Sequence, residues 1–119
     1  MQKFDEKLPI ENIVLAFNFT GGLAPGETLT GSPTVTITVL KGTDPNPNAI
    51  ANGAAAINAT AVTLPNGTVI AIGMAVLVPV KAGLDLNDYL IVAECATTNA
   101  LKVLAWPGVL PVRAEPDSD

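Results

Sequence analysis

The sequence predicts an all-β domain, an antiparallel β-sandwich of about seven short strands. The run TVTITV at residues 34–39 alternates threonine with valine or isoleucine, and a period of two places the two kinds of side chain on opposite faces of a strand. The ten glycines and ten prolines fall mostly between apolar runs, where turns would separate short strands. One face of the 34–39 strand is therefore expected to lie on a core, and the other to face water or a partner.

The composition indicates a single folded domain. Of the 119 residues, 49% are hydrophobic and only 14% are charged, whereas disordered chains have the opposite balance. A chain of this length can enclose its own core. We expect one domain over residues 1–119, with short arms at residues 1–8 and 114–119, because charged residues gather there outside the apolar pattern.

Two strands are expected before the middle of the chain. The first covers residues 8–19, where apolar residues alternate with others from position 13 onward. The second covers residues 29–40 and contains Gly31 and Pro33 near its start, which predict a kink or bulge. The sequence Asp-Pro-Asn-Pro-Asn follows and predicts a turn, because proline presets φ and aspartate and asparagine bond to their own backbone.

The middle third is less regular. Residues 49–64 are rich in alanine, which by propensity alone would favour a helix, but an Asn-Gly pair interrupts the run and short strands are expected instead. A second Asn-Gly pair at residues 66–67 predicts a hairpin. Residues 68–80 form a long apolar run whose β-branched residues favour strand over helix.

The last third supplies two more strands, at residues 89–98 and 101–113. A tight turn joins them, and Pro107-Gly108 is expected to interrupt the second. The alternation along all strands predicts a single core that includes Ile13, Leu15, Phe17, Val35, Ile37, Val39, Ile91 and Val103.

Tyr89 begins the penultimate strand, four residues after Asp85. In Ig-like sandwiches a tyrosine that enters this strand can hydrogen-bond back to the preceding corner. The spacing therefore predicts a structural role for Tyr89, with contact to a ligand as the alternative.

The residue types offer little for catalysis. The chain has no histidine, which excludes Ser-His-Asp and Cys-His sites and any histidine-ligated metal. Cys95 is the only cysteine, and its place in an expected strand favours a small buried hydrophobe over a nucleophile. The sequence contains no glycine-rich phosphate loop and no paired-cysteine motif. We expect a protein that is not an enzyme, with no catalytic, cofactor-binding or metal-binding residues and no small-molecule substrate.

Two features leave alternatives open. Asp85, Asn87 and Asp88 form an oxygen-rich cluster that could either hold Ca²⁺ or cap the turn before the next strand. Trp106 precedes the Pro-Gly pair and could lie at the edge of the core or at a protein–protein contact.

The charge pattern bears on possible partners. The net charge is −5 and the six basic residues are scattered, whereas binding to a nucleic-acid backbone needs clustered Lys and Arg. The first residues lack the basic and apolar regions of a signal peptide, and no apolar run approaches the ~20 residues of a membrane-spanning helix. We therefore expect no nucleic-acid or membrane partner.

Two stretches resemble small Ig-like virion proteins of tailed bacteriophages, most closely the fiber–tail adaptor or neck-type proteins. They are residues 23–50, LAPGETLTGSPTVTITVLKGTDPNPNAI, and residues 89–113, YLIVAECATTNALKVLAWPGVLPVR, which ends in the tetrapeptide Leu-Pro-Val-Arg. The chain departs from the pattern at Asn99-Ala100, where a glycine turn is expected, and in its unusually apolar run at residues 69–80.

The resemblance implies an Ig-like β-sandwich and a structural role in a virion assembled in the host cytoplasm. The implied protein is an adaptor at the tail or neck, present in multiple copies, whose partners are other virion structural proteins and copies of itself. The alternatives are a capsid decoration (cement) protein and a non-viral carbohydrate- or cell-surface-binding β-sandwich. The last class usually displays several exposed aromatic rings, whereas this chain has one Trp and one Tyr.

Overall fold

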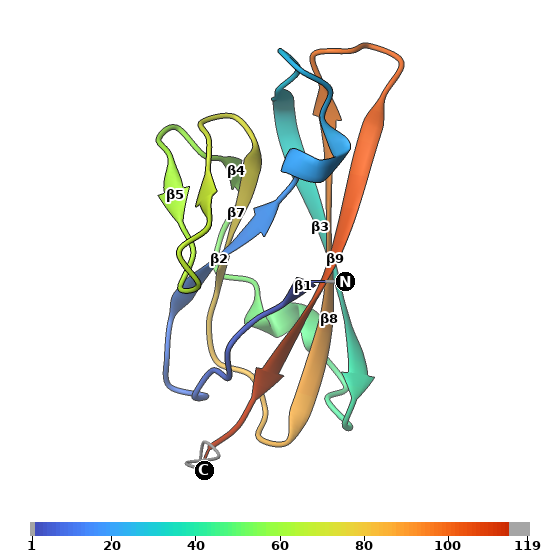
Figure 1. Cartoon of the computed structure of the whole chain (residues 1–119). Helices are drawn as coiled ribbons and strands as arrows, with labels where there is room; N and C mark the ends of the chain where they lie inside the picture. The colour runs from blue at the N-terminus through green and yellow to red at the C-terminus, as the bar shows by residue number, and fades with distance from the viewer. Residues whose placement is uncertain (1, 115–119) are drawn as a thin grey trace.

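The computed structural model describes residues 2–114, and it shows an all-β domain in which two main sheets pack face to face (Figure 1). The first sheet has the strand order β1 (Gln2–Lys3), β9 (Val103–Val112), β8 (Asn87–Thr97) and β3 (Leu29–Lys41). The second sheet has the order β2 (Ile13–Asn18), β7 (Ala75–Val80) and β4 (Ala56–Ile57). A small hairpin pairs β5 (Val62–Thr63) with β6 (Val69–Ile70), and two 3-10 turns, η1 (Thr20–Gly22) and η2 (Pro47–Ile50), join strands.

The connectivity is that of an Ig-like sandwich, which confirms the predicted fold class. In chain order, β2, β3, β4, β7, β8 and β9 take the places of strands B, C, D, E, F and G, so that β9-β8-β3 forms one sheet and β2-β7-β4 the other. These strands pair in antiparallel fashion, whereas β1 joins the edge of β9 in parallel. About seven strands were expected, and residues 2–114 contain nine β elements, of which β1, β4, β5 and β6 are only two residues long.

The core lies between the two main sheets and follows the alternation of the strands. Phe17 and Ile91 are fully buried and Ile37 is nearly so. Seven of the eight expected core residues lie in the core or pack against it. The expectation for Val103 was wrong, because its side chain is 61% exposed. On β9 the even-numbered residues face inward, and a slip of one position in a strand exchanges its two faces.

The first strand is shorter than the expected range of residues 8–19, and the chain before it pairs elsewhere. Strand β2 begins at Ile13, and residues 2–7 instead follow the edge of β9. The Phe4 N–H donates to the Val109 carbonyl at 3.0 Å, and the Lys7 N–H donates to the Pro111 carbonyl at 2.9 Å. The segment expected to be an arm thus lies along the edge of its own domain from residue 2 to residue 7. The expected C-terminal arm lies outside the described residues except for Ala114.

Strand β9 runs without a break through Pro107-Gly108, contrary to the expected interruption. The glycine serves a close approach: a Cβ at Gly108 would lie 2.6 Å from Phe4 Cε2 and 2.9 Å from Phe17 Cε2. These two rings meet edge to face with their centroids 5.0 Å apart, directly over the strand. The expected bulge is present, since the β3–β8 register shifts between Thr30 and Thr34.

Candidate functional site

Tyr89 is fully buried and ties the start of β8 to two loops. Its hydroxyl oxygen accepts a hydrogen bond from the Leu84 N–H at 3.0 Å and donates to Asp44 Oδ2 at 2.6 Å. Burial, together with the bond to Asp44, raises the pKa of Tyr89 to about 12. The predicted tyrosine corner is therefore confirmed, and the side chain is used for structure.

Asn87 lies beside this corner and is only 4% exposed. Its Oδ1 atom accepts hydrogen bonds from the backbone N–H groups of Thr43 at 2.8 Å and Asp44 at 3.3 Å. Its Nδ2 atom donates to the carbonyl oxygens of Asp85 at 2.9 Å and Leu84 at 3.3 Å. One side chain thus holds two loops together, and its amide group is fully occupied.

The three residues of the oxygen-rich cluster do not converge. Asp85 Oδ1 accepts the Ala114 N–H at 2.8 Å, and Asp88 Oδ1 forms an ion pair with Arg113 at 2.8 Å. Asn87 faces the interior, and its strand neighbour Asp88 points to the opposite side. Within residues 2–114 no group of three or more acidic or cysteine side chains is placed to hold a metal ion. The geometry supports the interpretation of this segment as a capped turn.

Replacement of Tyr89 by phenylalanine tests the corner. We expect the free energy of unfolding to fall by about 1–2 kcal/mol at neutral pH, because the variant loses both hydrogen bonds of a buried hydroxyl. The raised pKa means that the folded chain holds the phenolic proton more tightly than the unfolded chain does. The associated stability is complete below the ordinary pKa of about 10 and is lost as the pH rises toward 12.

Urea unfolding of the wild type and the Tyr89→Phe variant between pH 8 and 12 measures both effects. The difference between the two proteins should shrink above about pH 10. A difference that stays constant over this range would contradict the assignment of the alkaline loss to Tyr89.

Two other buried groups are also engaged in the fold. Cys95 is 1% exposed, and its Sγ atom lies 3.4 Å from the Thr30 carbonyl oxygen. Burial raises the pKa of the Cys95 thiol, which disfavours the reactive thiolate. Lys7 is 1% exposed, and its ammonium group donates to the carbonyls of Leu8 and Ala82. Burial lowers the pKa of Lys7, and the nearby Glu11 partly opposes this effect. The burial of Lys7 has no local sequence signal.

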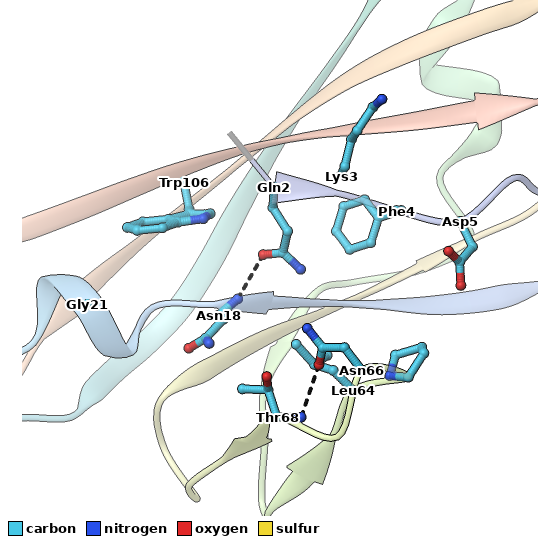
Figure 2. Close-up of a pocket in the computed structure, with 11 residues that line it drawn as sticks. Gln2, Lys3, Phe4, Asp5, Asn18, Gly21, Leu64, Asn66, Thr68 and Trp106 are labelled. Carbon is cyan, nitrogen blue, oxygen red and sulfur yellow. Dashed lines mark hydrogen bonds between the residues drawn. The ribbon is translucent and has the colours of Figure 1, made fainter.

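A groove of about 640 Å³ lies beside the end of β2, and we call it the β2 groove. Figure 2 shows the N-terminal segment on one side of it and the turn of the β5–β6 hairpin on the other. Its lining includes Gln2, Phe4, Asn18, Leu64, Pro65 and Trp106. The sequence did not predict this groove, because its lining comes from four separate stretches of the chain.

Trp106 joins the core to this groove. Its ring is half-buried and packs on Phe19 at a centroid distance of 6.1 Å. It also lies close to the backbone of Gly21, where a Cβ would approach the ring to 3.8 Å. Trp106 is thus at the edge of the core, and its remaining surface faces the β2 groove; its contact with another protein stays a prediction.

The middle of the solvent-facing side of the first sheet carries few charges. Exposed Thr34, Thr36 and Thr38 on β3 pair with Glu94, Val92 and Leu90 on β8, and the latter three pair with Ala105, Pro107 and Val109 on β9. We call these nine residues the outer sheet face; Val109, at its end, is only 8% exposed. Glu94 is its single charged side chain, although the whole chain carries a net charge of −5.

Comparisons with protein families, with curated proteins and with solved structures give no match to this chain. Among the helical segments of residues 2–114, none has the length and apolar character needed to cross a membrane.

Proposed function

We propose that the protein is a non-enzymatic structural subunit of a tailed-phage virion, an adaptor at the tail or neck that binds other virion proteins in multiple copies. The resemblance of residues 23–50 and 89–113 to such proteins supports the virion context. The outer sheet face is the structural observation that carries the proposal, because it suits contact with another protein.

The composition of the outer sheet face is that of an interface centre. Depletion of charge distinguishes the centre of protein–protein interfaces from the rest of a protein surface. The face offers threonine hydroxyls and aliphatic side chains around Glu94, so a neighbour can approach it without strong repulsion from the acidic chain. A sheet face of this kind can pack against a second protein surface.

The free edge of β3 adds to this surface. Strand β3 has thirteen residues, pairs with β8 on one side and ends the order of its sheet on the other. Its backbone groups on the free side can bond to a partner, whereas edge strands that avoid partners usually carry charges or are short. Lys41 is the only charged residue of β3 and stands at its end.

Mutation of the outer sheet face tests the proposal in particles of the phage that encodes the chain. We expect mass spectrometry of purified virions to detect the wild-type protein, and Thr36→Lys to reduce its incorporation at least about tenfold, because it buries a charge in the contact. Thr36 is exposed, so the variant should fold normally. Val69→Lys is the matched control, since Val69 is 63% exposed on the β5–β6 hairpin, away from the face.

The possible outcomes test the virion role and the outer sheet face separately. Absence of the wild-type protein from purified virions would refute the virion role. Full incorporation of the Thr36→Lys variant would leave the role intact and refute the outer sheet face as the contact. A capsid decoration protein is distinguished by copy number, because it would be recovered in proportion to the capsid protein rather than to tail or neck proteins.

A further inference from the structure

The edge of β2 lacks a neighbouring strand. Strand β2 pairs with β7 and ends the order of its sheet. In an Ig-like sandwich the first strand commonly pairs with strand B on this edge. Here the first strand, β1, lies on β9 in the opposite sheet, as Figure 1 shows, so within residues 2–114 no strand takes the place beside β2.

The direction of the β2 backbone groups follows from its neighbours. In an antiparallel pair, the residues that exchange hydrogen bonds alternate with residues whose N–H and C=O groups point away. The Phe19 N–H donates to the Met74 carbonyl on the β7 side at 2.9 Å. Val14 lies opposite Pro79, which has no N–H and cannot exchange such a pair of bonds. The even-numbered residues of β2 therefore direct their backbone groups to the open edge.

Gln2 already occupies part of this edge. Its Nε2 atom donates to the Ala16 carbonyl at 2.7 Å. Its Oε1 atom accepts the Asn18 N–H at 3.1 Å, and Figure 2 shows this second bond. A side-chain amide has the donor and acceptor of a peptide group. The two bonds are those that one residue of an added strand would make, so Gln2 stands in for a single residue of a missing strand.

The β2 groove extends this edge and has two apolar sides. Phe4 and Trp106 line it toward the core, and Leu64 lines it on the hairpin side (Figure 2). Pro65, the next residue in the chain, also belongs to the lining. Side chains of an added strand point alternately to two sides. Lys3 and Asp5 contribute one charge of each sign, which suits a segment without large net charge.

We propose that the β2 groove binds an extended arm of another protein, which adds as a strand beside β2, displaces the Gln2 amide and places alternate apolar side chains in the groove. Recognition by strand addition takes affinity from backbone bonds and specificity from alternate side chains. The inference deepens the proposed function and rests on it only for the partner, another virion protein. The acidic C-terminal sequence of a second copy, Ala-Glu-Pro-Asp-Ser-Asp, is a poor occupant, because it has three acidic residues for the single basic residue Lys3 and no large apolar side chains for the groove.

A synthetic probe tests the groove with the full chain. The probe is an acetylated and amidated peptide of alternating threonine and valine with a lysine at each end, and its binding is measured by calorimetry. The control has the same side chains but N-methyl groups on alternate residues, which remove backbone donors. We expect the control to bind at least about tenfold more weakly, because backbone bonds supply the affinity.

Removal of the Gln2 amide is expected to strengthen binding of the probe rather than weaken it. Gln2→Ala should tighten binding of the probe about tenfold, because the peptide no longer has to displace two hydrogen bonds. An ordinary lining residue would weaken binding when truncated. Gln2→Met keeps the length of the side chain without its amide, and it should tighten binding in the same direction if packing of β1 is preserved.

Hydrogen exchange locates the bound peptide. We expect the amides of Val14 and Ala16 to gain protection on binding, while those of Leu15 and Phe17, which face β7, change little. No binding to the wild type or to either Gln2 variant would overturn the proposal, as would protection confined to the free edge of β3. Failure of peptide binding would refute the groove proposal and would not bear on incorporation into virions. Absence of the protein from virions, together with normal peptide binding, would refute only the proposed function.

Discussion

Truncation of Phe17 to alanine is expected to lower the free energy of unfolding by about 3–5 kcal/mol. Phe17 is fully buried on β2, meets the Phe4 ring edge to face and lies against Gly108. Its removal would lose apolar burial and an aromatic contact, and it would leave a cavity between the two sheets. Because small domains are stable by only about 5–15 kcal/mol, this is a large fraction of the total.

Urea unfolding measures the loss, and Val14→Ala is the matched control. Val14 lies on the same strand but is 61% exposed, so its truncation should cost no more than about 0.5 kcal/mol. A loss below about 1 kcal/mol for Phe17→Ala would show that the two sheets do not close over this side chain as the structure has them.

Replacement of Asn87 by alanine is expected to lower the free energy of unfolding by about 2–4 kcal/mol. The side chain bonds to four backbone groups, in residues 43, 44, 84 and 85, and its loss leaves them without these partners. Gly42 shows how tightly the amide is enclosed, since a Cβ there would lie within 1.8 Å of Asn87 Oδ1.

Asn66→Ala is the control for this variant. Asn66 also accepts a backbone N–H, from Thr68 at 3.0 Å, but it does so at the exposed tip of the β5–β6 hairpin. Its loss should cost no more than about 1 kcal/mol, because water replaces the lost bond. Equal effects of the two substitutions in thermal or urea unfolding would contradict the role of Asn87 as a buried connector.

Local patterns were sufficient for the long strands and the turns. The alternation in TVTITV predicted β3, and the apolar residues from Ile91 to Cys95 predicted the inner face of β8. The Asn-Gly pair at residues 66–67 predicted the β5–β6 hairpin. Tyr89 was predicted as a corner residue from its spacing to Asp85, and its hydroxyl bonds to Leu84 and Asp44. These features depend on side-chain period and on turn chemistry, which a short stretch of sequence contains.

The predictions were wrong where strand limits and strand faces depend on contacts with residues far away in the sequence. The strand expected over residues 8–19 was too long at its start, because β2 begins at Ile13 and the chain up to Lys7 bonds to β9 instead. Val103 was assigned to the core because nothing near it reveals which parity of β9 faces inward. Pro107-Gly108 locally predicts a break, whereas the glycine in fact makes room for two rings that are distant in sequence.

The sequence by itself determined that the chain is an all-β sandwich, where its main turns lie and which residue types are unavailable for chemistry. Only the tertiary structure decided that β1 pairs with β9, that Lys7 is buried and that the edge of β2 stays open beside a groove. The physical reason is the range of the interactions. Alternation and turn preferences act between near neighbours, whereas Gln2 meets Ala16 and Asn18, and Trp106 meets Phe19, only after the two sheets have closed.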